Sequence, residues 1–305
     1  MMYIYIIGRR NGRLFVVLLL SSQSYIFIHR NDLRKGIRVQ KTITELGRKE
    51  AEFLSHMSTA GGQFNIEQAV KFWRSREMAN KKLHQLEKRG WVARIERGKY
   101  LVIPLEAGAQ RSWSEEPYLI ASTLVQPAAI SYWTAIRHWN WTEQIPRIIY
   151  IQTTSRKKAT GRTVFGVQYQ FVTVPKTKFY GHVKEWYKGK PVLISDKEKT
   201  LVDCADDVER AGTIEELAKA VKSAATEISW LKFNEHVQRF PNRAVMKRLG
   251  FLFERLVTPL PDEAQRVLQG WQPVLSAGVA PLQPGGSATG RISTRWHIQI
   301  NTEVE

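Results

Sequence analysis

The stretch from Ser75 to Ile103 constrains the fold of this chain more than any other. Its apolar residues Ala79, Leu83 and Leu86 recur at intervals of four and three, which places them on one face of a helix. Gly90 then ends the helix, and the residues after it alternate as two short strands around a glycine turn. The stretch therefore predicts a helix that is followed directly by a β-hairpin.

Two helices are predicted before this stretch. From Thr42 to Met57 the apolar residues are spaced at three and four, and a pair of glycines ends the pattern. Asn65 is suited to cap a second helix over Ile66–Trp73, and Ser75 is suited to cap the third. Three helices followed by a hairpin is the element order of a winged helix-turn-helix. The sequence therefore predicts such a domain over residues 41–106.

The polar side of the third helix and the hairpin carry residues typical of a DNA contact. A helix fits the major groove, and the free N–H groups at its start suit a phosphate. Basic residues beside the hairpin turn would contact the DNA backbone, which adds affinity without sequence specificity. An ordinary solvated basic face is the alternative interpretation. The predicted DNA-binding residues are Ser75, Arg76, Asn80, Lys81, His84, Lys88, Arg94, Arg97 and Lys99.

Charge favours the DNA interpretation. The chain has a formal net charge of +18, which favours a polyanionic partner, first of all double-stranded DNA. Residues 1–110 hold 20 Lys and Arg against 9 Asp and Glu, whereas the other 195 residues hold 26 against 19. The single cysteine, Cys204, excludes an internal disulfide and fits a reducing cytoplasm. Its apolar helical surroundings predict a buried thiol.

Residues 1–40 form an N-terminal extension without a regular pattern. Arginines precede the apolar run Leu14–Leu20, as at the start of a signal peptide, but no small-residue cleavage site follows. The run is far shorter than the ~20 residues that span a bilayer, so no membrane partner is predicted. An extra strand pair and a leader translated from an upstream start codon both fit. The sequence favours the leader.

A larger mixed α/β domain is predicted over residues 107–257, after a Gly/Ala/polar connection at 105–113, which makes the whole chain α+β. Residues 258–305 read as a Pro/Gly-rich tail that ends in a strand, Arg295–Asn301. The predicted helices are Pro117–Leu124, Pro127–Trp139, one from Asp196, Ile214–Ala225, Trp230–Arg239 and Ala244–Leu256. The predicted strands are Ile148–Thr153 and Pro191–Ile194, and Val164–Val174 is predicted as a strand or a hairpin.

One acidic cluster, between Asp196 and Asp207, invites a metal-dependent nuclease interpretation. A structural role is favoured, because Ser195 to Glu198 has the S-x-x-E form of a capping box. No Asp/Glu-x-Lys, Gly-rich phosphate loop, His/Glu metal spacing or nucleophile elbow is present. The sequence therefore predicts no catalytic residue, no cofactor and no metal.

Four segments together resemble the AbiEi-type antitoxins of bacterial abortive-infection (type IV) toxin–antitoxin systems, which are transcriptional regulators of viral defence. These segments are Leu86–Pro104, Gln126–Glu143, Val192–Cys204 and Val245–Leu256. The resemblance implies a winged helix that represses its own operon at an inverted repeat. It also implies an antitoxin domain that opposes a nucleotidyltransferase-like toxin, whether or not the two proteins touch.

Two other functions remain open from the sequence. One is a nucleic-acid-processing enzyme that a winged helix delivers to its substrate. The other is a stand-alone winged-helix transcription regulator whose second domain binds a different ligand or partner.

Overall fold

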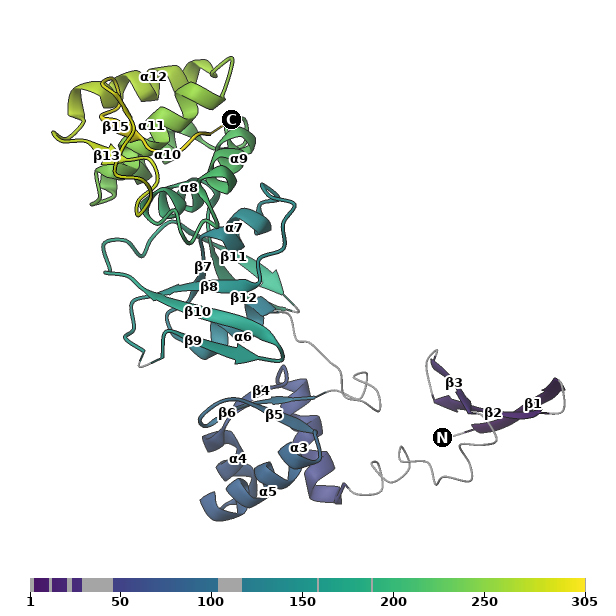
Figure 1. Cartoon of the computed structure of the whole chain (residues 1–305). Helices are drawn as coiled ribbons and strands as arrows, with labels where there is room; N and C mark the ends of the chain where they lie inside the picture. The colour runs from purple at the N-terminus through teal and green to yellow at the C-terminus, as the bar shows by residue number, and fades with distance from the viewer. Residues whose placement is uncertain are drawn as a thin grey trace. The chain divides into compact units, whose positions relative to one another are not determined.

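The computed structural model (Figure 1) describes residues 3–10, 13–20, 24–28, 46–103, 117–157, 159–187 and 189–304. The chain divides into two compact units, Met1–Trp113 and Ser114–Glu305. Both units combine helices and sheets, so the protein is α+β, as predicted. The predicted connection at 105–113 lies outside the described residues.

The N-terminal segment contains a three-stranded antiparallel sheet. Its strands are β1 (Tyr3–Arg10), β2 (Arg13–Leu20) and β3 (Ser24–Ile28), with β2 in the centre. The apolar run 14–20 forms most of β2. The strand interpretation of residues 1–40 fits this backbone, and the leader interpretation, which concerns the start of translation, stays a prediction.

Residues 46–103 form three helices and a three-stranded antiparallel sheet of order β4-β6-β5. The elements are α3 (Arg48–Thr59), β4 (Gln63–Asn65), α4 (Ile66–Trp73), α5 (Arg76–Lys88), β5 (Val92–Glu96) and β6 (Lys99–Val102). Helix α4 has the predicted bounds, because the Asn65 and Gln68 side chains each accept the other's backbone N–H. Helix α3 begins at Arg48, later than the predicted Thr42, and Thr42 lies outside the described residues. Strand β4 was not among the predicted elements.

The core of these residues lies under α5 and around an aromatic cluster. Ala79, Leu83 and Leu86 on α5 are buried, as their spacing predicts. They pack in one cluster with Phe53 of α3, whose ring meets that of Phe64 edge-on at a centroid distance of 5.1 Å. Burial of one side of α5 leaves the opposite side to solvent.

The second unit is built on a six-stranded mixed sheet of order β11-β12-β7-β8-β10-β9. In Figure 1, helix α6 (Pro117–Leu124) lies on one face of this sheet, and α7 (Trp133–His138) and α8 (Lys197–Asp206) lie on the other. The strands are β7 (Ala129–Ile130), β8 (Ile148–Thr153), β9 (Gly161–Val164), β10 (Val167–Thr173), β11 (His182–Tyr187) and β12 (Lys190–Ser195). Because both faces are covered, β8 is buried along almost its whole length.

The predicted helix Pro127–Trp139 is wrong in its first half. Ala129 and Ile130 form β7 between β8 and β12, and the helix begins only at Trp133. Tyr132 separates the two elements with a φ of 57°, a conformation that a continuous helix excludes. Strand β11 was also not predicted, because it is an edge strand whose residues are half-exposed and lack a clear alternation of apolar side chains.

A layer of five helices completes the unit, with α11 (Ala244–Leu256) in contact with the other four. The others are α8, α9 (Ile214–Ala224), α10 (Trp230–Arg239) and α12 (Asp262–Trp271), which is followed by the 3-10 turn η2 (Gln272–Val274). A small sheet of order β13-β15-β14 packs against α11; its strands are β13 (Ala280–Pro281), β14 (Arg291–Ser293) and β15 (Ile298–Ile300).

Residues 258–304 are an integral part of this unit, whereas the sequence predicts a Pro/Gly-rich tail there. Helix α12 was not predicted, and the predicted final strand is shortened to β15. Lys247 Nζ donates to the Gly278 carbonyl at 2.7 Å, and Arg248 Nε donates to the Pro281 carbonyl at 2.9 Å. Two buried cations of α11 therefore fix the segment by satisfying its backbone oxygens.

No described helix is long and apolar enough to cross a membrane.

Candidate nucleic-acid interface

Helix α5 presents the predicted polar face to solvent. Ser75 caps the helix, because its Oγ accepts the Met78 N–H at 3.3 Å. The predicted residues of this helix and its cap are all exposed: Ser75, Arg76, Asn80, Lys81, His84 and Lys88. The structure therefore brings these six residues to one surface, opposite the buried Ala79, Leu83 and Leu86.

The hairpin is short and anchored. Gly98 has a φ of +77° in its turn, and its carbonyl accepts the Ile66 N–H at 2.8 Å, which ties the turn to the start of α4. Arg94 and Arg97 are exposed, whereas Lys99 is half-buried and forms an ion pair with Glu96 at 3.2 Å. The predicted hairpin cations therefore differ in how free they are to contact DNA.

One predicted helix cation is also partly engaged. Arg76 Nη2 lies 2.7 Å from Glu67 Oε1, and both side chains are largely exposed, so the pair contributes about 0–1 kcal/mol. Lys81, Lys88, Arg94 and Arg97 form no ion pair with another described residue. These four side chains are the ones that can neutralise phosphates without losing an acidic partner.

Two further cations, Lys82 of α5 and its C-cap residue Arg89, serve the fold. Glu50 of α3 is buried, and its carboxylate accepts hydrogen bonds from Lys82 at 2.9 Å and Arg89 at 2.7 Å. Burial by itself raises the pKa of Glu50, but the two cationic donors outweigh it and hold the pKa below its ordinary value. The cluster therefore joins α3 to α5 and withdraws Lys82 and Arg89 from the free positive charge of the surface.

Arg74 is a residue that the sequence prediction omits. It is exposed, it lies directly before the Ser75 cap, and its φ of 58° is left-handed. A non-glycine residue in this conformation places its side chain at the turn between α4 and α5. The signal in the sequence is its position between the end of one helix and the cap of the next.

The acidic cluster of the second unit is structural in its contacts. Asp196, not Ser195, caps α8, because its Oδ1 accepts the Lys199 N–H at 2.7 Å. Glu198 does not reach back as a capping box would require; it accepts the Ser229 N–H at 2.8 Å instead. The predicted S-x-x-E capping box is therefore wrong, although the predicted helix start is right.

Farther along α8, Lys199 and Asp203 form a fully buried ion pair, and Ser195 Oγ donates to Asp203 at 3.1 Å. Burial raises the pKa of Asp203, and the charge and hydrogen bond of Lys199 partly offset that rise. Cys204 is fully buried, as predicted. No group of three His, Cys, Asp or Glu side chains in the described part of the chain is placed to hold a metal ion. Lys199, Asp203 and Cys204 are therefore shielded from solvent.

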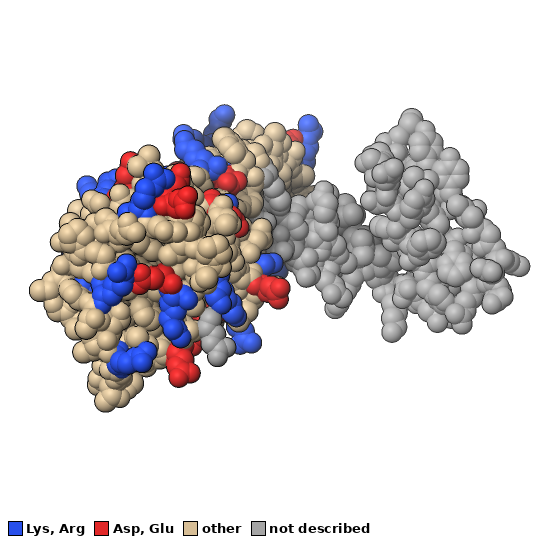
Figure 2. Space-filling view, turned by 90° about the horizontal axis from the view of Figure 1, so that it is seen from above, with Lys and Arg blue, Asp and Glu red and all other residues tan. Residues whose placement is uncertain are grey.

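Most of the described surface seen in Figure 2 belongs to uncharged residues, and charged side chains of both signs are scattered over it. Lys and Arg side chains lie next to Asp and Glu side chains there and form no patch of one sign. Residues 46–103, in contrast, contain 12 Lys and Arg against 6 Asp and Glu. The free cations of α5 and the hairpin are therefore the better candidate for a polyanion contact.

Comparison with known proteins shows a fold likeness only. No family model matches the sequence, and no curated protein matches it. The chain is similar in structure to the RV2827C protein from Mycobacterium tuberculosis, with a TM-score of 0.59 and 14% sequence identity. The match covers 83% of this chain and 92% of that protein, so it extends over more than one of the two units.

Proposed function

We propose that residues 46–103 are a winged-helix DNA-binding domain, through which the protein represses its own operon. The observation that carries this proposal is the exposed polar face of α5, which is capped by Ser75 and followed by the β5–β6 hairpin. In this proposal α5 lies in the major groove of an operator. Asn80 and His84, one helical turn apart, read base edges, and Lys81 and Lys88 contact phosphates.

The second unit is, in the same proposal, the antitoxin domain, which counteracts a nucleotidyltransferase-like toxin in the cytoplasm and has no enzymatic activity of its own. The resemblance to AbiEi-type antitoxins supports this part. Three of the resembling segments also meet in the core of the second unit. Ser131 and Ser195 share a hydrogen bond of 2.9 Å, Trp139 Nε1 donates to the Ser195 carbonyl at 3.0 Å, and Arg248 Nη1 donates to the Ala205 carbonyl, one residue past the third segment, at 2.9 Å.

A gel-shift titration with the DNA upstream of the protein's own gene tests the DNA-binding part. Replacing Lys81 and Lys88 by Ala removes two free cations, so we expect weaker binding and a salt slope reduced by about two. The matched control replaces Lys184 and Lys222, two exposed lysines of the second unit, and should leave both quantities unchanged. Equal affinities for the two double variants would contradict the proposed interface.

A rescue assay tests the antitoxin part. The adjacent reading frame is expressed with and without this chain, and growth of the host is measured. We expect the neighbour to be toxic alone and harmless together with the chain. A neighbour of another class, or toxicity that the chain does not relieve, would favour the stand-alone regulator instead.

A further inference from the structure

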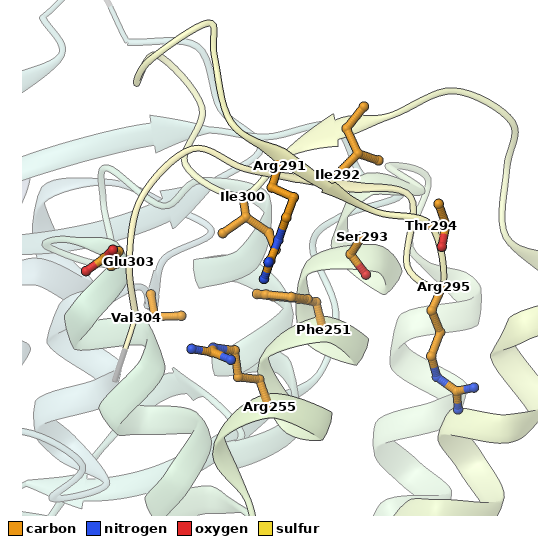
Figure 3. Close-up of a pocket in the computed structure, with 10 residues that line it drawn as sticks. All are labelled: Phe251, Arg255, Arg291, Ile292, Ser293, Thr294, Arg295, Ile300, Glu303 and Val304. Carbon is orange, nitrogen blue, oxygen red and sulfur yellow. The ribbon is translucent and has the colours of Figure 1, made fainter.

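A half-open pocket of about 580 Å³ lies between the end of α11 and the C-terminal strands (Figure 3). Phe251 and Arg255 line it from α11, and Arg291 lines it from β14. Ile300 of β15 and Val304 complete its apolar side. This size lies within the usual range of small-molecule sites.

Two arginines of the pocket have no acidic partner among the residues that the structure describes. In Figure 3, Arg291 points down from β14 toward Phe251, and Arg255 extends from the last turn of α11 beneath Val304. Neither forms an ion pair with a described residue, whereas the neighbouring Arg295 is neutralised by Glu254 at 2.7 Å. Both guanidinium groups are exposed, so water screens their mutual repulsion, and an anion between them would be attracted by both.

The remaining lining suits an anion with an apolar portion. Phe251, Ile300 and Val304 form an apolar wall beside the arginines, in which Phe251 and Val304 are largely buried and Ile300 is half-buried, and Ser293 adds a hydroxyl. Glu303 is the acidic residue of the lining, and Figure 3 shows its carboxylate at the edge, turned away from both guanidinium groups. Planar guanidinium groups bind phosphate oxygens in pairs and stack against aromatic rings.

The pocket is held in a defined shape. Arg291 pairs with Ile300 in the β14–β15 ladder, so the strand that carries the arginine is fixed to the strand that supplies the apolar wall. Gly290, just before β14, approaches the Ile300 carbonyl so closely that a Cβ would lie 2.3 Å from its oxygen. In a preformed site of this kind, little free energy is lost in ordering the side chains when a ligand binds.

We propose that this pocket binds a nucleotide, with its phosphates between Arg255 and Arg291 and its base against Phe251, Ile300 and Val304. The site lies entirely in the second unit and uses none of the residues proposed for DNA binding. The nucleotide-binding proposal can therefore be tested independently of the DNA-binding proposal.

Calorimetric titration of the full-length chain tests the proposal, with ADP, GDP, inorganic phosphate and adenosine as separate probes. We expect the diphosphates to bind, inorganic phosphate to bind more weakly, and adenosine not to bind measurably. Arg255→Gln and Arg291→Gln should each weaken ADP binding about tenfold or more. Arg266→Gln, at an exposed arginine of α12, is the matched control and should change nothing.

Two further variants sharpen the result. Glu303→Gln removes a negative charge from the edge and should tighten ADP binding, since both ligand and carboxylate are anionic. The Lys81→Ala/Lys88→Ala variant should bind ADP normally, which separates this site from the proposed DNA interface. Binding that survives both arginine substitutions, or no binding of ADP or phosphate in the millimolar range, would overturn the proposal. Tighter binding of a carboxylate peptide than of ADP would overturn the choice of ligand.

Discussion

At the scale of the residue, Glu50 shows how one buried carboxylate joins two helices. It is 5% exposed and accepts hydrogen bonds from Lys82 of α5 and from Arg89, the C-cap residue of that helix. Its pKa is lowered in the folded chain, so the ionised form stabilises the fold. That stabilisation is fully present above the ordinary pKa of 4.5 and is lost as the pH falls through the lower folded value.

Replacing Glu50 by Gln should destabilise the first unit by about 1–2 kcal/mol at neutral pH, because two cations lose their partner while staying partly hydrated. The loss should shrink as the pH falls from the ordinary pKa of 4.5 through the lower folded value, where Glu50 itself becomes protonated. Thermal unfolding of the full chain at neutral pH and across this range measures the effect. The control is Glu52→Gln, at an exposed position of the same helix. An equal loss of stability in both variants would contradict the stabilising role of Glu50.

Gly250 is a second decisive residue, because it lets Trp296 pack against α11. A Cβ at this position would lie 2.0 Å from the Trp296 ring, which is itself buried. Gly250→Ala should therefore destabilise the second unit by about 1–3 kcal/mol through overpacking. Gly270→Ala in α12 meets no atom within 4 Å and should be neutral or stabilising by up to about 1 kcal/mol. Chemical denaturation of both variants measures these changes in stability. An unchanged stability of Gly250→Ala would contradict the close packing of Trp296 against α11.

At the scale of the element, the β5–β6 hairpin carries cations of unequal freedom. Arg97 is exposed at the turn, whereas Lys99 is engaged with Glu96. Arg97→Ala should therefore lower the salt slope of DNA binding by about one, and Lys99→Ala should lower it less. Gel shifts across a range of salt concentrations measure both slopes. A larger effect of Lys99→Ala would show that the ion pair opens on DNA, contrary to this prediction.

Helices were easier to predict than strands in this chain, for a local reason. The bounds of α4, α6, α10 and α11 match the predicted ranges, since their apolar spacing lies within each segment. Helices α4 and α10 also have a capping side chain directly before them, Asn65 and Ser229. Strand β7 was predicted as helix, because Ala129 and Ile130 take their conformation from β8 and β12, which are distant in the sequence. Helix α12 was missed because it lies among prolines and glycines that read as a loop.

At the scale of the whole molecule, we expect substitutions in the two units to impair DNA binding and toxin rescue separately. Asp203→Ala leaves the buried ammonium of Lys199 without its partner and should destabilise the second unit by about 3–5 kcal/mol. The variant should lose toxin rescue but keep operator affinity, while Lys81→Ala/Lys88→Ala should do the reverse. The two assays, run on both variants, measure this separation. A metal-dependent nuclease activity that Asp203→Ala abolishes in folded protein would instead favour the enzyme alternative.

The sequence by itself determined the local features of the candidate interface. The Asn65 and Ser75 caps, the buried stripe of α5 and the glycine turn of the hairpin depend on neighbouring residues, and all of them are present. Glu96 pairs with Lys99 within the hairpin, but which of the other cations are free depends on the fold, because Glu50 and Glu67 meet their partners through folding. Only the tertiary structure placed Arg255 and Arg291 in one pocket, since strand pairing brings β14 to the end of α11 from 36 positions away along the chain. Local spacing carries no information about such contacts.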